Sequence, residues 1–308
     1  MTSSGVKDQA VSIRHRLRNL AAERQEESGF VLTRYAVQRL LHRLSRSEFR
    51  DRFLLKGATL FAVWSDRPHR PTRDLDLLGF GDNDIAAVQD VFRTLCSTYD
   101  PEDGLGFVPE SVQGRRIRGG QEYQGVRLTL LAMLGKTRIP LQVDVGFGDD
   151  VYPAPDEIEV PGLIGLPSAR VWAYPRETVV AEKLQAMVEL GIANSRMKEF
   201  YDLWMLAREF PFSGATLVES VRRTFVRRRT SIPSTVPLAL SEEFAADRGK
   251  TIQWVAFLRK SGLGTGSDLE AVIQTLAVFL LPVLGAASHL QPLDAIWPQG
   301  GPWKSLHD

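Results

Sequence analysis

The chain has 308 residues, of which 44% are hydrophobic and 24% are charged, and its formal net charge at pH 7 is +1. This composition is typical of a globular protein with one large domain or two ordinary ones, and it excludes a uniformly basic or acidic chain. The one cysteine, Cys96, excludes a disulfide framework and a cysteine-based zinc site within one chain.

The N-terminal part predicts helices followed by a short strand. Residues 6–25 and 31–44 carry apolar side chains at helical spacing, which indicates two amphipathic helices. The start of the chain has no apolar stretch of the kind that a secretory signal needs. A short apolar run, residues 53–55, then ends at Lys56 and Gly57. This change from helical spacing to a continuous apolar run predicts a short strand.

The next segment combines a helix, a loop and a strand. Residues 58–64 can form a helix of about two turns, and residues 65–73 form a polar loop with prolines. Residues 74–80 alternate at first and then become apolar, which suits a strand. Residues 84–99 predict a helix that contains Cys96, and in this apolar setting we interpret the cysteine as a small buried hydrophobe.

Three strand-like segments follow, at residues 106–118, 123–134 and 138–148. Short alternating runs and glycines mark them, and their connections look like hairpins. We therefore expect a mixed sheet and not a purely parallel one. Residues 151–168 are rich in proline and have few periodic features, which predicts a linker or an extended loop.

The C-terminal part predicts helices. Its longest apolar stretch, residues 271–287, is interrupted by Gln274 and Pro282, and we interpret it as a buried helix, with no membrane partner. The fold class is therefore α+β, with a mixed sheet core, N-terminal helices packing on it and a helical C-terminal domain. The expected divisions are 1–50, 51–168 and 169–308. The expected helices are 175–190, 196–209, 216–229, 241–258 and 269–284.

Lys56, Gly57 and Ala58 form a candidate phosphate-binding turn. Glycine lets the backbone approach a ligand closely, and a helix that begins there points free N–H groups outward. Asp74 and Asp76 are spaced i, i+2 on the predicted strand, so that both carboxylates face the same side. Such a pair is a hard oxygen site for Mg²⁺ (or Mn²⁺). Together these features indicate phosphoryl or nucleotidyl transfer.

Asp144 lies in the apolar run LQVDVGFG and is the third candidate carboxylate. An ionised aspartate in such a strand is costly to bury without a partner, and a metal shared with Asp74 and Asp76 would supply one. The alternative is a position on the solvent face. We favour the metal, with Asp144 as general base or as ligand of a second metal. We also expect the hydroxyl of Thr72 to reach the nucleotide; an ordinary loop threonine is the alternative.

These patterns resemble the AbiEii/AbiGii toxin family, which includes the MenT toxins, within the nucleotidyltransferase superfamily typified by DNA polymerase beta. The resemblance spans roughly residues 54–206, about half the chain. Two positions depart from the family pattern. Ala58 follows the turn glycine where the family has glycine or serine, and Glu199 replaces the first aspartate of R-x-K-D-x-x-D. The segments that carry the resemblance are FLLKGATLFAVW, PTRDLDLLGF, LQVDVGFG, ETVVAEKLQAM and SRMKEFYDLWML.

The resemblance implies that the three aspartates named above hold the metal, and that Asp202 is a further catalytic residue. It also implies that Lys183 and Lys198 contact the triphosphate, Lys183 with a catalytic role, while Asp202 orients that part of the pocket. The residues alone allow simpler roles. Lys198 and Asp202 are spaced i, i+4 and can form an ordinary surface ion pair. Lys183 lies beside an apolar stripe, where lysines often extend to solvent.

Clusters of arginine predict a surface for a polyanion, because basic side chains are grouped in a chain of near-zero net charge. An ordinary solvated surface is the alternative for each cluster. A further basic group, Arg67, His69, Arg70 and Arg73, lies beside the D-x-D segment. The residues expected to contact RNA are Arg115, Arg116, Arg222, Arg223, Arg227 and Arg228.

We expect a cytoplasmic, monomeric nucleotidyltransferase that moves a nucleoside monophosphate from a nucleoside triphosphate onto an acceptor. The resemblance implies a toxin of a bacterial toxin–antitoxin system, with a cognate antitoxin encoded nearby and a role in phage defence. It also favours RNA as the acceptor, in particular the tRNA 3′ end, with translation blocked as the result. Two alternatives remain open. One is transfer to a protein or a small molecule, and the other is a non-catalytic protein that binds nucleotide or RNA.

Overall fold

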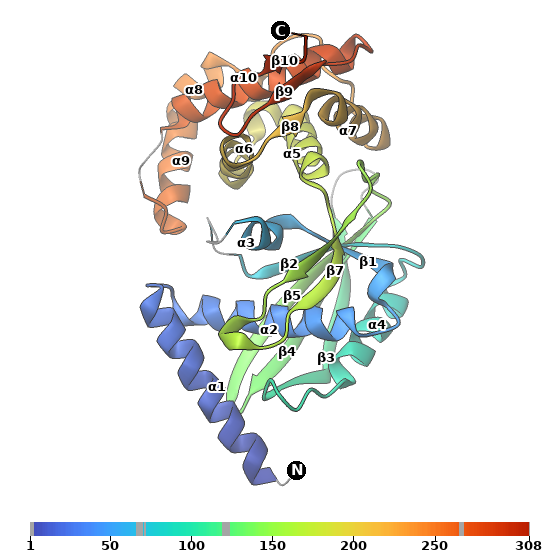
Figure 1. Ribbon diagram of the computed structural model, residues 1–308, viewed down its shortest axis with the longest axis vertical. Coiled ribbons are helices and arrows are strands. Elements are labelled where there is room, and N and C mark those ends of the chain that lie inside the picture. The colour runs from blue at the N-terminus through green and yellow to red at the C-terminus, as the bar shows by residue number, and fades with distance from the viewer. Residues whose placement is uncertain (1–2, 66–69, 71, 119–123, 265–267, 308) are drawn as a thin grey trace. The chain divides into compact units, whose positions relative to one another are not determined.

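The computed structural model describes residues 3–65, 70, 72–118, 124–264 and 268–307 (Figure 1). The chain divides into two compact units. Unit 1 consists of Met1–Gly148 and Asp156–Ala173, and unit 2 consists of Asp149–Pro155 and Tyr174–Asp308. Unit 1 holds a mixed sheet with helices, and unit 2 is mainly helical, so the α+β fold class is confirmed.

Unit 1 is built on one sheet with the strand order β3-β4-β5-β2-β1-β7-β6, seven strands within the described residues. The pairs β2/β5 and β1/β7 are parallel, and the other neighbours are antiparallel. The expected mixed sheet and the β3/β4/β5 hairpins are therefore confirmed. The strands are β1 (Phe53–Lys56), β2 (Asp74–Gly79), β3 (Leu105–Arg118), β4 (Gln124–Leu134), β5 (Thr137–Phe147), β6 (Asp156–Val160) and β7 (Ala169–Ala173).

Helices cover one face of this sheet. Helix α2 packs against β5 and β7, and α4 packs against β3 and β4. A Cβ atom on Gly114 of β3 would lie 2.7 Å from a side-chain carbon of Ile85 in α4, so Gly114 faces that helix. Its neighbour Arg115 must then point to the opposite face, which is called the open face below. The helices are α1 (Ser3–Glu23), α2 (Ser28–Ser45), α3 (Phe61–Trp64) and α4 (Ile85–Ser97).

Two segments of unit 1 differ from the sequence expectation. Residues 58–64 were expected to form one helix, but a 3-10 turn at Gly57–Leu60 precedes the four-residue α3. The proline-rich segment 151–168 was expected to be a linker, and this is wrong for its middle part, which forms β6. Strand β6 pairs along its whole length with β7, so that cross-strand pairing supplies the order that the sequence pattern does not indicate.

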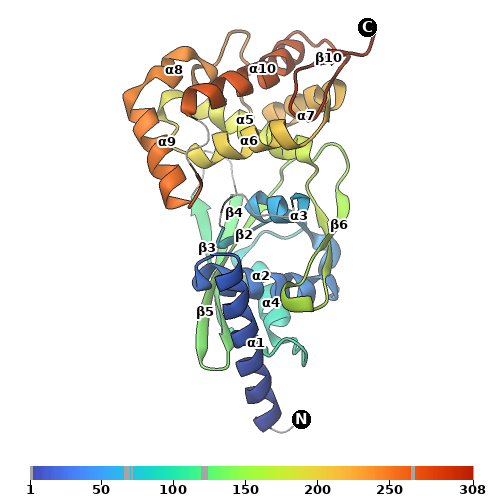
Figure 2. The ribbon, with the colours of Figure 1, turned by 60° about the vertical axis from the view of Figure 1, so that its left-hand side comes forward.

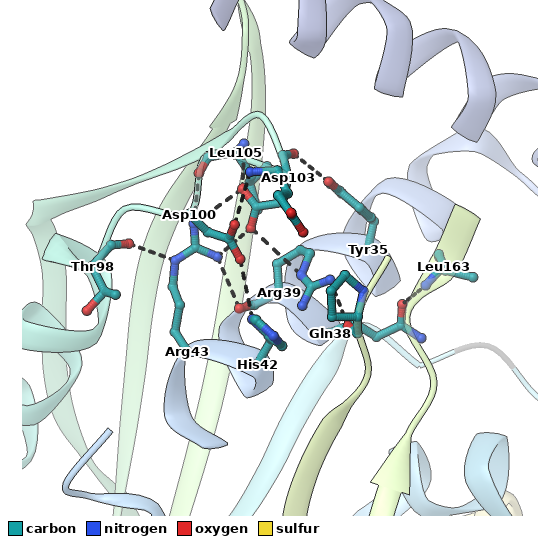
Figure 3. A network of polar contacts seen from close by, with 12 residues as sticks. Tyr35, Gln38, Arg39, His42, Arg43, Thr98, Asp100, Asp103, Leu105 and Leu163 are labelled. Carbon is teal, nitrogen blue, oxygen red and sulfur yellow. Dashed lines mark hydrogen bonds and ion pairs between the residues drawn. The ribbon is translucent and has the colours of Figure 1, made fainter. Parts of the chain in front are cut away.

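A network of buried charges anchors α2 inside unit 1 (Figure 3). The guanidinium of Arg43 donates to the Asp103 carboxylate at 2.7 and 3.4 Å. It also donates to the backbone carbonyls of Thr98 and Leu105. Arg39 makes fewer hydrogen bonds, because its Nε lies 3.7 Å from the carboxylate and, among the described residues, its Nε and Nη2 have no hydrogen-bond partner. The network joins α2 to the loop that precedes β3.

His42 lies at the edge of this network, 3.4 Å from the carboxylate of Asp100 (Figure 3). Burial and the charge of Arg39 hold the pKa of His42 below its ordinary value, and the charges of Arg46 and Arg43 act in the same direction. The opposing charge of Asp100 is weaker than these effects together. His42 is therefore an imidazole that resists protonation in the folded protein.

Unit 2 is a helical assembly in which α10 packs against α6, α7 and α8 (Figure 2). Its aromatic core includes Phe200 and Phe244, stacked with ring centroids 5.2 Å apart. The helices are α5 (Arg176–Leu190), α6 (Met197–Glu209), α7 (Gly214–Arg227), α8 (Glu242–Ala246), α9 (Arg248–Lys260) and α10 (Leu269–Ser288). A small sheet has the order β10-β9-β8, from β8 (Phe212–Ser213), β9 (Ala295–Trp297) and β10 (Lys304–Ser305).

The short segment Asp149–Pro155 belongs to unit 2 through specific polar contacts. The backbone N–H of Tyr152 donates to the hydroxyl of Thr178 at 3.1 Å, and that hydroxyl donates to the carbonyl of Tyr152 at 2.8 Å. The carboxylate of Asp149 lies 3.3 Å from the guanidinium of Arg228. The chain therefore contributes to unit 2 once before β6 and again after β7.

Helix α10 matches the expected buried apolar helix. Among the described residues it is the one helix long and apolar enough to cross a membrane, and 44% of its most apolar stretch is buried inside the fold. The core helix of a globular protein passes the same test. The prediction of a single helix at residues 241–258 is wrong, because α8 ends before Asp247 and α9 begins after it. The Asp247 side chain accepts from the backbone N–H of Lys250 and so caps a new helix, α9.

Candidate active site

The turn after β1 brings Gly57 against Asp76. Gly57 has φ +74°, and a Cβ atom there would lie 2.1 Å from Oδ2 of Asp76. Lys56, which precedes the turn, is the cross-strand partner of Asp76. Glycine is therefore required for two reasons, the left-handed backbone and the space taken by the carboxylate. The expected phosphate-binding turn and the D-x-D strand are in direct contact.

Strand register aligns five charged residues across the open face. Asp76 on β2 pairs with Lys56 on β1 and, on its other side, with Asp144 on β5. Asp144 pairs with Arg127 on β4, and Arg127 pairs with Arg115 on β3. Directly paired residues point to the same face of a sheet. Lys56, Asp76, Asp144, Arg127 and Arg115 are called the charged row below.

The strand alternation predicted for the D-x-D segment is confirmed. Asp74 is exposed and Asp76 is half-buried on the open face, whereas Leu75 and Leu77 between and after them are buried. Asp144 is likewise half-buried between the buried neighbours on its strand. Thr72 lies just before this strand, and its hydroxyl donates to the backbone carbonyl of Asp74 at 3.4 Å. The loop before β2 is thus connected to the backbone of the first aspartate.

Asp144 forms a bidentate ion pair with Arg127. The Nε and Nη2 atoms of Arg127 donate to the two carboxylate oxygens of Asp144 at 2.7 and 2.6 Å. Two parallel charge-assisted hydrogen bonds make this one of the strongest side-chain contacts in proteins. The hydrogen bond to Asp144 raises the pKa of Arg127 above its ordinary value, and the charges of Asp144, Asp74 and Asp76 add to this effect.

The carboxylates fit a divalent cation only in part. Asp74 and Asp76 present oxygen donors on one open face, which suits Mg²⁺ with water and phosphate as its other ligands. Asp144 has both oxygens committed to Arg127. Among the residues that the structure describes, no three Asp, Glu, His or Cys side chains converge in a way that could hold a metal. The chemistry of the donor set therefore fits a cation at Asp74 and Asp76.

A second polar group lies in unit 2, where Lys183 of α5 reaches two carboxylates of α6. Its ammonium donates to Asp202 at 2.9 Å and also contacts Glu199. Asp202 is fully buried, and the Lys183 side chain is 12% exposed. Lys198 is exposed, and the ion pair of Asp202 is with Lys183. Glu199, which departs from the family pattern, thus contacts the same lysine as Asp202.

The two arginines on β3 that were predicted to contact RNA point to opposite faces of the sheet. Arg115 is exposed at the end of the charged row. Arg116 points to the other face, where it donates to the backbone carbonyl of Asn83 at 2.9 Å and lies 4.0 Å from Asp84. In the third basic group, the predicted residues Arg67 and His69 lie outside the described residues.

The arginines of α7 and the turn after it have mixed environments. Arg222 donates to three backbone carbonyls near the end of α10, at 3.0 to 3.4 Å. Arg228 lies 3.2 and 3.3 Å from two carboxylates of unit 2. Arg223 pairs with a glutamate one turn earlier on α7 at 2.8 Å, and Arg227 is exposed. Arg222 and Arg228 therefore have structural partners within unit 2.

Arg127 was not among the residues predicted from the sequence. It is the one charged side chain in the run GVRLTLLAML, which is the same signal that singled out Asp144 in its own strand. Applying the same reasoning to both strands would have found it. Its pairing with Asp144 depends on strand register, which the sequence pattern does not give.

Residues 39–275 match the family described as nucleotidyl transferase AbiEii toxin, type IV TA system. No curated protein matches the chain. The fold is similar to crystal structures of JHP933 and of a candidate nucleotidyltransferase, both from Helicobacter pylori, at 12% and 15% identity and TM-scores of 0.46 and 0.42. Each likeness covers 82% of this chain, and 90% and 93% of the other chain, respectively. Because the family match covers most of its length, the chain belongs to the AbiEii family of nucleotidyltransferase toxins of type IV toxin–antitoxin systems.

Proposed function

We propose that this nucleotidyltransferase uses Mg²⁺ (or Mn²⁺) to move a nucleoside monophosphate from a nucleoside triphosphate onto RNA. The favoured acceptor is the 3′ end of tRNA, whose modification would block translation. One observation carries the proposal: Asp74 and Asp76 share the open face, with Asp76 directly against the Gly57 turn. A glycine turn that opens a helical segment beside paired carboxylates is suited to a metal–triphosphate substrate.

Each residue of this site has a chemical task in the proposed reaction. Asp74 and Asp76 would hold the metal, and the backbone N–H groups after Gly57, at Ala58 and beyond, would bind phosphate oxygens. When bound, Mg²⁺ supplies positive charge that offsets the charge on the transferring phosphate. An acceptor hydroxyl oxygen bonds to the α-phosphorus, the bond to pyrophosphate breaks, and the hydroxyl proton passes to a base, the role proposed for Asp144. Lys56, beside Asp76, would neutralise phosphate charge.

The group in unit 2 has a role that the family likeness supports. Lys183 would contact the triphosphate, and Lys198, which is exposed, would make a further contact with it. Asp202 accepts from Lys183 at 2.9 Å and would orient its ammonium. The contact between Glu199 and Lys183 supports a shared role for Glu199 in that orientation. Thr72, next to Asp74, would touch the nucleotide through its hydroxyl.

A polyanionic acceptor is supported by Arg115, which is exposed on the same face as the carboxylates. Arg116, Arg223 and Arg227 are further proposed contacts for RNA, since each is exposed. Arg222 and Arg228 are weaker candidates for RNA contact, because they have partners within unit 2. We place the reaction in the cytoplasm, by a monomer whose antitoxin is encoded nearby, with phage defence as the biological setting.

The test is a transfer assay. The purified protein is incubated with Mg²⁺, each α-³²P-labelled nucleoside triphosphate in turn, and total bacterial tRNA. The Asp76→Asn variant, which keeps the shape of the side chain, is compared with Asp90→Asn. Asp90 is an exposed aspartate on α4, paired with Arg93 and facing away from the site, and it serves as the matched control.

We expect label in tRNA with one triphosphate, its loss with Asp76→Asn and its retention with Asp90→Asn. Digestion of the labelled tRNA would locate the added nucleotide at the 3′ end. Label on protein or on a small molecule alone would contradict RNA as the acceptor. Equal transfer by wild type and Asp76→Asn would contradict the assignment of the site.

A further inference from the structure

The charged row places a positive residue, Arg127, directly beside Asp144, which was expected to be the third metal ligand. Asp76 and Asp144 are direct neighbours on adjacent parallel strands, and like charges so placed repel each other. Arg127 lies on the other side of Asp144 and holds both of its oxygens. The repulsion is therefore relieved within the sheet itself. Asp144 thus has a charged partner on its own sheet that holds both of its oxygens.

We infer that Arg127 is a positioning residue that keeps Asp144 out of the metal's coordination shell. This inference rests on the metal-dependent transfer proposed above. The cation would then be held by Asp74 and Asp76 alone. Each Asp144 oxygen accepts one hydrogen bond from Arg127, so a cation that takes the same lone pair would displace at least one of two charge-assisted hydrogen bonds. It would also leave the guanidinium of Arg127 beside the incoming metal, and the two positive charges would repel.

Charge balance points in the same direction. The charge of Asp144 is balanced by Arg127 within the sheet, so Asp144 needs no cation as a partner. The Arg127–Asp144 pair is only partly exposed, with 30% of the arginine and 18% of the aspartate side chain accessible. Partial burial makes water a poorer substitute for either partner. Arg127 therefore fixes the number of carboxylates that a metal can use.

The inference predicts an unusual result, in which loss of a positive side chain creates a better metal site. Arg127→Met removes the charge and keeps a long side chain, which frees Asp144 to become a third ligand. Mn²⁺ binding to the protein without nucleotide is measured by loss of the electron paramagnetic resonance signal of free Mn²⁺. We expect Arg127→Met to bind Mn²⁺ about tenfold more tightly than wild type.

A double-mutant cycle separates this effect from a change in folding. Asp144→Asn in the wild-type background should change the Mn²⁺ affinity by about twofold or less. In the Arg127→Met background it should abolish the roughly tenfold gain, because the gain needs the freed carboxylate. Arg138→Met is the matched control, since Arg138 is exposed on β5 on the same face as Asp144. It should leave Mn²⁺ binding unchanged.

The inference is overturned if Asp144→Asn alone weakens Mn²⁺ binding as much as Asp76→Asn. It is also overturned if Arg127→Met folds normally but binds Mn²⁺ no more tightly than wild type. Should Arg127→Met be insoluble, the comparison of Asp144→Asn with Asp76→Asn still decides the question. A different result, in which Asp76→Asn leaves Mn²⁺ binding intact, would contradict the proposed function itself. The two failures are thus distinguishable.

Discussion

Replacing Asp103 with asparagine tests how strongly buried charges hold α2 in unit 1. The carboxylate is fully buried, accepts from Arg43 at 2.7 and 3.4 Å, and lies 3.7 Å from Nε of Arg39. Asparagine keeps the shape but removes the charge, so that two buried guanidinium groups remain without a counter-ion. Changing one partner of a buried ion pair costs about 3–5 kcal/mol. We expect Asp103→Asn to lower the free energy of unfolding by about that amount.

The two arginines should respond unequally to truncation. Arg43→Met removes both hydrogen bonds to Asp103 and leaves that carboxylate buried with a distant partner, so a loss of about 3–5 kcal/mol is expected. In Arg39, Nε and Nη2 have no hydrogen-bond partner within the described part of the chain, and burial lowers the pKa of its guanidinium. Its Nη1 donates to the carbonyl of Pro167. We expect Arg39→Met to cost about 1 kcal/mol or less.

The measurement is urea unfolding of the variants, followed by far-UV circular dichroism, with an unchanged slope as evidence that the unfolding reaction is the same. Hydrogen exchange of the α2 amides would assign the loss to unit 1. A loss below about 1 kcal/mol for Asp103→Asn would refute the reasoning, because it would show that the buried charge needs no counter-ion. An equal loss for Arg39→Met and Arg43→Met would refute the asymmetry.

Three further predictions follow from the structure. Burial and nearby arginine charges lower the pKa of His42 in the folded protein. The free energy of unfolding should therefore be highest above about pH 6.5, and it should decrease as the pH drops from there toward the folded pKa. His42→Gln should flatten that part of the curve, measured by urea unfolding, and an unchanged curve would contradict the lowered pKa. Burial raises the pKa of Cys96 to about 12, so a disulfide reagent should label the thiol only in denaturant; rapid labelling of the folded protein would contradict this. Gly57→Ala should abolish Mn²⁺ binding and transfer by displacing Asp76, whereas Gly135→Ala, also at positive φ but without a close neighbour, should be active. An equal loss of activity in the two variants would show that backbone strain and not the clash matters, and full activity of Gly57→Ala would contradict the prediction.

The side-chain alternation of the site could be predicted from the sequence, because a period of two fixes which residues of a strand share a face. This was enough to place Asp74 and Asp76 together. It was not enough to show that Asp144 meets Arg127, since their pairing depends on the register of β4 with β5. The Lys183 contacts likewise depend on how α5 packs against α6, which no local pattern records.

The fold was predictable where a local pattern decides the structure, and was missed where a distant partner or a capping side chain does. The hairpin strands β3, β4 and β5 carry alternating or apolar runs and were predicted. Strand β6 contains three residues of weak strand propensity, Asp156, Glu157 and Glu159, and it forms because β7 lies beside it. The break between α8 and α9 comes from one capping side chain, Asp247, inside an otherwise helical pattern.

The charged row also makes the site sensitive to a kind of mutation that changes no side chain of the site. Because its members come from different strands, deletion of one residue near the start of β5 would shift the pairing by a single step. Asp144 would then turn toward the helices, and Val143 or Val145 would take its place beside Asp76. Insertions and deletions within β2, β4 and β5 should therefore be as damaging to catalysis as loss of an aspartate, whereas length changes in the loops between these strands leave the pairing frame intact.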